Sequence, residues 1–323
     1  YVNGTQICTG NAETFTITVN PTPNVVDPAN QNLCVGNQSL PVLFTGNVSG
    51  TTYAWTNNNP SVGLPASGTG NIASITGQNP GQTPIVATIS VQAQYSNAGQ
   101  LCLGNTETFT ITVNPQPQVT APQNQVVCNG AQVAAINFTG PSTGTTYVWS
   151  NNNPSIGLAA SGAGNIGMFT ATNTGNTPIT ATVTVTAQYV NGTQICTGNA
   201  ETFTITVNPL VTMQAVAPVV ACAGDVVPII QFSGNAQPSV FNWTNSNPSI
   251  GIPASGSGPI PAFTAVNSGA AAQIANITVT PGFVNGVNVC AITPVSFSIT
   301  VNPTPQLVVP TAQVVCSGSL VSA

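Results

Sequence analysis

The sequence predicts an all-β protein made of tandem two-sheet sandwich modules, and three observations carry that prediction. The segment YVNGTQICTGNAETFTITVNP at 1–21 recurs unchanged at 189–209, and related copies begin at Tyr95 and Phe283, so each step is 94 residues. Apolar residues alternate with threonines over 14–19, which is the period-two pattern of a strand with one buried face. Clusters of the 31 Gly and 27 Pro residues divide the chain into short segments, as turns between strands do.

Each repeat holds enough short strands for one sandwich. In the first complete repeat, strands are expected at Leu40 to Phe44, Thr52 to Thr56, Ile72 to Thr76, Ile85 to Tyr95 and Glu107 to Val113. About seven short strands, with turn signals every 8 to 12 residues or so, are typical of an immunoglobulin-like fold. Trp55 recurs as Trp149 and Trp243, and we expect these side chains to pack in the core between the sheets rather than to bind a ligand.

Proline-rich junctions separate the repeats. Proline fixes its own φ and biases the residue before it towards an extended conformation, so these links are expected to be short, extended and stiff. The junctions share the letters VNP and begin at Val19, Val113, Val207 and Val301. They predict three complete modules at 21–114, 115–208 and 209–302, flanked by the C-terminal end of a preceding module at 1–20 and the start of a following one at 303–323. We therefore expect the chain to be a segment of a longer protein.

The charge composition excludes several classes of partner. The chain has no Lys, Arg or His, and its formal charges are five acids, Glu13, Asp27, Glu107, Glu201 and Asp225. Nucleic acids and anionic lipids are excluded as partners, because a protein needs cations to neutralise their phosphates. No apolar run approaches the ~18 residues of a membrane-spanning helix, so this segment is not expected to insert into a membrane.

The same absences predict that the protein is not an enzyme and holds no cofactor. A Ser, Thr or Cys nucleophile would have no His or Lys base beside it. A glycosidase needs paired carboxyl groups, whereas Glu13, Glu107 and Glu201 occupy one position of the repeat and provide about one acid per module. One acid per module is also too few for a calcium site. We expect no metal site, and we expect these acids to be solvated surface residues.

The sequence motifs of the repeats resemble those of a known family. They include the letters VNPTP at the junction, Cys34-Val35-Gly36 after it, the block WTNNNPSVGL that begins at Trp55, and a Y-x-N turn before a Cys and TFTITVNP. These features are similar to the PKD-like, immunoglobulin-like repeats of giant cell-surface proteins of Bacteroidetes, such as the repetitive gliding-motility adhesin of SprB type. The resemblance covers the whole chain. It implies type IX secretion, attachment at the outer membrane surface and, in the gliding adhesin, movement by an envelope motor; the secretion signal of such proteins lies at the C-terminus, beyond this segment.

Eight cysteines recur with the repeat, two in each module. They are Cys8, Cys34, Cys102, Cys128, Cys196, Cys222, Cys290 and Cys316. They form an even set without His or carboxylate neighbours and without a C-x-x-C motif. This pattern indicates disulfides in an oxidising compartment rather than a zinc site or a catalytic thiol.

Three cysteine pairings respect the period. Pairing within a module, as Cys34 with Cys102, would let each module fold alone, but the length of the first strand puts these residues at opposite ends of the module. Pairing across one junction, as Cys8 with Cys34, requires that junction to be a hairpin. The third scheme links each module covalently to the next, which makes the row a stiff rod, and its pairs are Cys34–Cys196 and Cys128–Cys290. We favour the third scheme and leave the other two open.

Three functions agree with these observations. The first is a structural stalk segment of a giant repetitive cell-surface adhesin, for surface attachment or gliding motility, since a spacer needs length and stiffness rather than a unique site. The second is a repeated carbohydrate-binding module that presents a loop such as 57–72 to a surface polysaccharide or substratum. The third is a subunit of an extracellular filament assembled through edge strands, because no Lys is present to block edge pairing. The expected partners are neighbouring modules of the same chain and, by resemblance, the envelope motility or secretion machinery.

Overall fold

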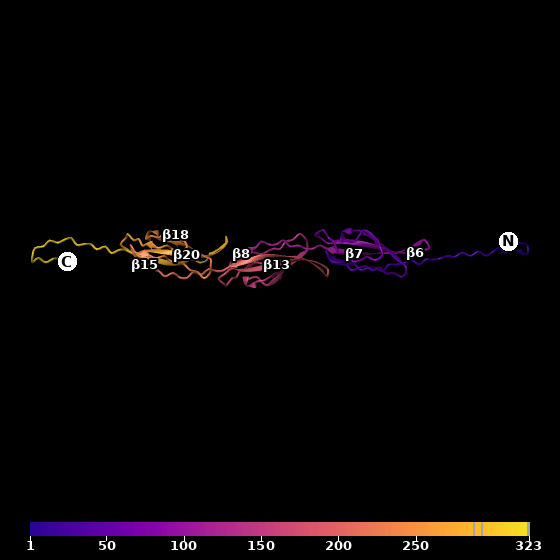
Figure 1. Cartoon of the computed structure of the whole chain (residues 1–323), viewed down its shortest axis with the longest axis horizontal. Helices are drawn as coiled ribbons and strands as arrows, with labels where there is room; N and C mark the ends of the chain where they lie inside the picture. The colour runs from indigo at the N-terminus through magenta and orange to yellow at the C-terminus, as the bar shows by residue number, and fades with distance from the viewer. Residues whose placement is uncertain (287, 292, 322–323) are drawn as a thin grey trace.

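Three β-sandwich modules follow one another in a row in the structure, a computed structural model that describes residues 1–286, 288–291 and 293–321 (Figure 1). The all-β class and the tandem sandwich architecture that the sequence predicts are confirmed. The two terminal segments extend from opposite ends of the row. In these described ranges the helices are single turns of 3-10 type, and no helix has the length and apolarity needed to cross a membrane.

One five-stranded sheet forms the larger layer of module 1. Its spatial order is β3-β7-β6-β4-β5, in which β3 and β7 are parallel and the other neighbours are antiparallel. β6 and β7 form a long hairpin whose tip projects beyond the rest of the sheet, because β4 pairs with β6 only over 89–94 and β3 pairs with β7 only over 111–114. The bounds are β3 Gln31–Cys34, β4 Thr52–Asn57, β5 Ser67–Thr69, β6 Ile85–Asn97 and β7 Gln100–Asn114.

The sheets of modules 2 and 3 repeat this topology. In module 2 the order is β11-β10-β13-β14-β8, and the strands are β8 Gln125–Cys128, β10 Thr145–Asn151, β11 Ser161–Ala163, β13 Ile179–Asn191 and β14 Gln194–Asn208. In module 3 the order is β15-β22-β20-β17-β18, and β21 also pairs with β20. These strands are β15 Val219–Cys222, β17 Ser239–Asn245, β18 Ser255–Ser257, β20 Gln273–Asn285, β21 Asn288–Ala291 and β22 Val295–Asn302. A separate small hairpin near the N-terminus consists of β1 Val2–Asn3 and β2 Gln6–Ile7.

The smaller layer of each sandwich is irregular, which corrects two sequence expectations. The segments 40–44 and 72–76, expected as strands, meet only through isolated bridges, one of which joins Val42 to Ile72. Pro41 has no N–H to donate to a ladder. The N–H of Phe44 donates instead to a side chain, the Oδ1 atom of Asn71, at 2.9 Å. Modules 2 and 3 have two-residue pairs in this layer, β9 Gln132–Val133 with β12 Phe169–Thr170 and β16 Val226–Val227 with β19 Phe263–Thr264.

Each module has its own hydrophobic core. The period-two alternation places alternate side chains of the central strands inside, as in β6, where Ile89 and Val91 are fully buried. Trp55, Trp149 and Trp243 lie in the three cores, and the three core clusters have no residue in common. The modules therefore touch one another only outside their cores.

The NNNP block, which reads NSNP in module 3, forms a tight turn at the edge of each core. In module 1, Asn57 is buried; its Nδ2 donates to the carbonyl oxygen of Leu64 at 2.8 Å, and its Oδ1 accepts from the N–H of Asn59 at 3.0 Å. A 3-10 helix follows and ends at Gly63, whose φ of 98° favours glycine. The helices are η1 Pro60–Val62, η2 Pro154–Ile156 and η3 Pro248–Ile250.

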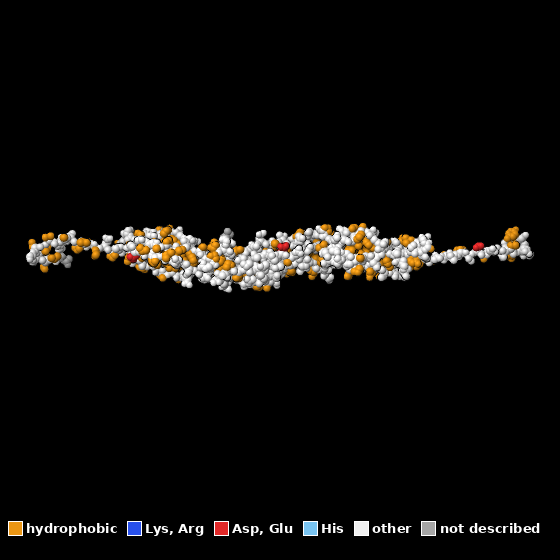
Figure 2. All heavy atoms as spheres, in the orientation of Figure 1, with side chains coloured by type: hydrophobic (Ala, Val, Ile, Leu, Met, Phe, Trp, Pro, Cys, Tyr) orange, Lys and Arg blue, Asp and Glu red, His pale blue; other side chains and the backbone are white. Residues whose placement is uncertain are grey.

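The surface of the row is polar but almost uncharged. Figure 2 shows isolated acidic side chains among uncharged atoms. The two terminal segments expose apolar side chains, such as Phe15 and Ile17 near the N-terminus and Leu307 near the C-terminus.

Candidate functional site: the joints between modules

The projecting hairpins of modules 2 and 3 each reach back over the end of the module before them. At the first joint, hairpin β13–β14 lies against β3 of module 1, and at the second joint β21 lies against β8 of module 2. Each hairpin tip therefore contacts the first strand of the sheet in the preceding module, β3 at the first joint and β8 at the second. These two joints are the places where chemistry-bearing side chains of separate modules come together.

Two disulfides close the joints. Cys34 of β3 is bonded to Cys196 of β14, with 5.5 Å between the Cα atoms. Cys128 of β8 is bonded to Cys290 of β21, with 5.6 Å between the Cα atoms. Both distances lie within the ordinary range for disulfides. The bonded pairs are those of the inter-module scheme, and each bridge spans 162 residues of sequence.

A hydrogen-bonded pair of asparagines lies beside each of the two inter-module disulfides, which we call staples. The Nδ2 of Asn191, at the hairpin tip, donates to the Oδ1 of Asn114 at 2.8 Å. The Nδ2 of Asn285 donates in the same way to Asn208 at 2.8 Å. Asn114 and Asn208 are the fully buried asparagines of the VNP junctions. Burying an amide without hydrogen-bond partners is costly. Each pair therefore fixes the hairpin tip to the end of the last long strand of the preceding module, β7 at the first joint and β14 at the second.

The first joint satisfies its buried amide completely, whereas the second does not. In the first joint, the Nδ2 of Asn114 donates to the Oδ1 of Asn32 at 2.6 Å, and Asn32 in turn donates to the carbonyl oxygen of Asn191 at 3.0 Å. Val126 occupies the position of Asn32 in the second joint. The Nδ2 of Asn208 is buried there without a hydrogen-bond partner.

Restoring the missing acceptor should strengthen the second joint. We expect Val126→Asn to stabilise modules 2 and 3 by about 1 kcal/mol, because the new Oδ1 can accept from Asn208 and Val126 is 39% exposed, so the change buries little new polar surface. Urea unfolding of the whole chain measures this change. Val220→Asn is the matched control, since the equivalent Asn302 is not buried. Equal effects of the two substitutions, or a loss of stability in Val126→Asn, would contradict this account of the joint.

The linker packs tightly against the hairpin that carries the staple. A Cβ atom on Gly198 would lie 1.9 Å from the carbonyl oxygen of Pro117, so only glycine permits this approach. Pro115 is buried, and the Oγ of Ser142 donates across the joint to the Oε1 of Gln82 at 2.6 Å. The first joint is therefore held by the linker, the hairpin and a loop contact together.

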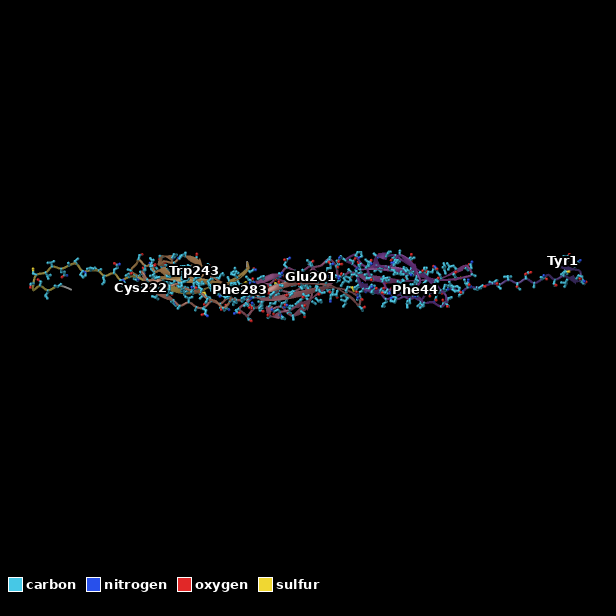
Figure 3. The ribbon with its side chains drawn as sticks, in the orientation of Figure 1. Tyr1, Phe44, Glu201, Cys222, Trp243 and Phe283 are labelled. Carbon is cyan, nitrogen blue, oxygen red and sulfur yellow. A yellow bond between two sulfur atoms is a disulfide. The ribbon has the colours of Figure 1, made fainter. Side chains whose placement is uncertain are left out.

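The second joint has a small apolar cluster of its own. Val211, Ala236, Phe283 and Cys290 are buried together, and Cys128 of module 2 packs against them. Phe283 lies where modules 2 and 3 meet (Figure 3). Burial of these side chains adds hydrophobic contact that is separate from the three cores.

The other candidate residues lie away from the joints or unpaired. Cys8, Cys222 and Cys316 are exposed and Cys102 is half-buried, and all four are free thiols in the described part of the chain. Nowhere in residues 1–286, 288–291 and 293–321 do three or more His, Cys, Asp or Glu side chains gather as a metal site requires. The acids make local contacts at most, as in the N–H of Cys222 donating to the Oδ2 of Asp225 at 2.8 Å.

Sequence reasoning missed the asparagines of the joint. A signal was present, because the Asn of VNP and the Asn of the Y-x-N turn recur in every copy, including the diverged one at Phe283. Asparagine is common in turns, so the local sequence gives both residues a sufficient reason to be there. Their contact becomes evident only when two modules are placed end to end.

Comparisons with known proteins show a similarity of fold alone. No protein-family model matches the sequence, and no curated protein matches it. Among solved structures, immunoglobulin domains 1–5 of Sidekick-1 are 15% identical with a TM-score of 0.34, and the match covers 88% of this chain and 60% of that one. Domains EC22–24 of mouse cadherin-23 are 9% identical with a TM-score of 0.40, over 88% of this chain and 99% of that one. The human desmocollin-1 ectodomain is 10% identical with a TM-score of 0.36, over 88% and 61%. This chain thus spans about 60% of the length of the Sidekick-1 and desmocollin-1 chains, and likeness at this level carries no argument about function.

Proposed function

We propose that this chain is a stalk segment of an extracellular, adhesin-type surface protein, in which stapled modules hold another part of the protein away from the cell. The repeating units of this proposal are 21–114, 115–208 and 209–302, joined at the VNP prolines. The observation that carries it is the pair of disulfides that link neighbouring modules rather than the two sheets of one module. Disulfides of this kind persist in oxidising compartments, which supports an extracellular location.

The two disulfides are interlaced, which suits a structure under tension. Cys128 lies inside the loop closed by Cys34–Cys196, and Cys196 lies inside the loop closed by Cys128–Cys290. Between the two bridges the chain therefore runs along three covalent routes in parallel: 34 to 128, 128 to 196 and 196 to 290. When the ends are pulled, the shortest route, the 68 residues from 128 to 196, limits the separation of the two bridges, so the two 94-residue routes cannot be drawn out to their full length while both bridges are intact.

The sequence motifs of the repeats allow a more specific proposal. By resemblance, we propose a giant repetitive adhesin of Bacteroidetes, exported by type IX secretion and held at the outer membrane for surface attachment or gliding. The envelope motility or secretion machinery would then be its partners. A stalk has no need of a catalytic, metal or cofactor site, and none is proposed.

Carbohydrate binding is the second candidate, and the loop 57–72 argues against it. The asparagines of this loop are engaged by their own module: the Nδ2 of Asn59 donates to the carbonyl oxygen of Val86 at 3.1 Å, and the Oδ1 of Asn58 accepts from the N–H of Thr88 at 2.8 Å. Trp55 is only 7% exposed and cannot stack on a sugar. A glycan array probed with the three-module chain tests this candidate, and saturable binding that scales with module number would favour it over the stalk.

Small-angle scattering tests the stalk directly. For arrays of two, three and four modules, we expect the radius of gyration to rise in proportion to module number, because the linker, the asparagine pair and the staple all restrict bending at each joint. Reduction should make the four-module array more flexible than its oxidised form. Growth with roughly the square root of module number in both redox states is the behaviour of a flexible chain and would contradict a stiff stalk.

A further inference from the structure

The hairpin tip at the first joint carries an Asn-Gly pair, Asn191-Gly192. β13 ends at Asn191 and β14 begins at Gln194, so Gly192 and Thr193 form a two-residue turn. Gly192 is exposed, its φ is 63°, and it has no Cβ atom. No side chain on Gly192 therefore hinders the approach of its backbone nitrogen to the side-chain carbonyl carbon of Asn191.

The side-chain amide of Asn191 is also the donor that holds the hairpin tip in the joint. Its Nδ2 donates to the Oδ1 of the buried Asn114 at 2.8 Å. The Nδ2 of Asn114 is engaged elsewhere, by the Oδ1 of Asn32 at 2.6 Å. Among the described residues, the Oδ1 of Asn114 accepts a hydrogen bond from Asn191 alone. Loss of the Asn191 amide nitrogen would leave that buried oxygen without a donor and beside a carboxylate.

We propose that Asn191 is a deamidation site and that its conversion to a carboxylate weakens the first joint irreversibly. Two features meet there: a glycine that leaves the backbone nitrogen free to react, and an amide nitrogen that the joint requires. Both recur at the second joint, where Gly286 has a φ of 60° and the Nδ2 of Asn285 donates to Asn208 at 2.8 Å. This modification depends only on the contacts of the joint and stands apart from the stalk function.

The reaction needs water and no other reagent. The backbone nitrogen of Gly192 loses its proton and bonds to the side-chain carbonyl carbon of Asn191. The bond from that carbon to Nδ2 breaks, and the nitrogen leaves as ammonia. Water then opens the resulting succinimide ring at either of its carbonyl carbons and gives an aspartate or an isoaspartate. No electrons are transferred, and one carboxylate replaces one amide.

Docking should slow this reaction, because the side chain must leave Asn114 before the ring can close. The joint therefore has to open locally first. Residues 1–21 and 189–209 have the same sequence, and Gly4 in the hairpin β1–β2 has a φ of 59°, close to that of Gly192. Asn3 is exposed. Asn3 and Asn191 thus share sequence and turn and differ in docking.

Asn129-Gly130 is a second Asn-Gly pair in module 2, but its reacting groups are held by the module itself. The N–H of Gly130 donates to the carbonyl oxygen of Ala171 at 2.8 Å, and the Oδ1 of Asn129 accepts from the N–H of Asn173 at 2.8 Å. The N–H of Gly192 donates no hydrogen bond among the described residues. Asn129 should therefore react only when module 2 unfolds.

The full oxidised chain, incubated in mildly alkaline buffer, tests the proposal by mass spectrometry. Cleavage after glutamate places Asn3 in peptide 1–13 and both Asn129 and Asn191 in peptide 108–201, where fragment ions separate them. We expect Asn191 to convert about tenfold more slowly than Asn3, because its hydrogen bond must break first, and Asn129 to stay intact. Reduction of the staple should raise the rate at Asn191 towards that at Asn3.

Three results of this time course would overturn the proposal. They are equal rates at Asn3 and Asn191 in the oxidised chain, an Asn191 that stays intact after reduction while Asn3 converts, and conversion of Asn129 as fast as that of Asn191, which would mean that module 2 unfolds. Gly192→Ala is the matched variant, since module 1 has Ala98 at this position. It should stop conversion at Asn191 and leave Asn3 reactive; continued conversion would contradict the succinimide route.

Asn191→Asp reproduces the product and tests its effect on the joint. We expect dithiothreitol to reduce Cys34–Cys196 about tenfold faster in this variant, because the buried oxygen of Asn114 has lost its donor. Asn3→Asp makes the same change in the same local sequence outside the two joints and should leave the rate of reduction unchanged. Equal rates in the two variants would show that the carboxylate does not weaken the joint and would overturn the proposal.

Discussion

Single-molecule pulling of the oxidised chain is expected to release less than half of its contour. With both bridges intact, the shortest covalent path runs 33 residues from Tyr1 to Cys34, 68 from Cys196 back to Cys128, and 33 from Cys290 to position 323. At roughly 3.5 Å per extended residue, this path reaches about 470 Å. The reduced chain can extend through all its residues, to about 1,100 Å at the same spacing.

The control for this measurement keeps both staples. Cys102→Ser with Cys222→Ser removes two thiols that are free in the described structure, so its oxidised contour should stay short. Cys34→Ser with Cys128→Ser should lengthen the oxidised contour to that of the reduced chain. A long contour in the oxidised unmodified chain would mean that the bridges do not link neighbouring modules.

Trp149→Ala is expected to destabilise module 2 by roughly 3 to 5 kcal/mol, because it removes a large buried aromatic side chain and leaves a cavity. Trp149 is 9% exposed and packs so closely on Gly162 that a Cβ atom there would lie 2.3 Å from the indole ring. Modules 1 and 3 should keep their stability, since neither core contains a residue of the module 2 core. Calorimetry of the whole chain would then show one unfolding transition shifted to a lower temperature.

Met168→Ala is the matched control in the same module. Met168 is 74% exposed, so its truncation should change stability by no more than about 0.5 kcal/mol. An unchanged calorimetric profile for Trp149→Ala would show that the indole does not support the core, and it would reopen a ligand-binding role for this residue.

The long hairpins and the repeat were predictable because local sequence specifies them. Alternation of apolar with polar residues specifies one buried face along β6 and β7, and a 94-residue period brings each feature back in the next module. The smaller layer was less predictable. Around Pro41 some backbone hydrogen bonds are made to side chains, such as that of Asn71, instead of to a neighbouring strand. Alternation of apolar and polar residues in the sequence does not reveal this.

The joint was only partly predictable, because its contacts join residues far apart in sequence. Spacing of the cysteines allowed three pairings, and the length of the first strand favoured one of them. The contact between Asn191 and Asn114, and the effect of Val126 on Asn208, depend on how the hairpin tip lies over the preceding module. That placement follows from three-dimensional packing between modules, which no local pattern encodes.

Disulfide mapping of the oxidised, unreduced chain by mass spectrometry tests the central claim most directly. After cleavage next to aromatic residues, the account predicts peptide pairs that join Cys34 to Cys196 and Cys128 to Cys290, and their loss on reduction. Recovery of Cys34 joined to Cys102, or of Cys128 joined to Cys196, would show modules closed on themselves and would contradict a stalk stapled from one module to the next.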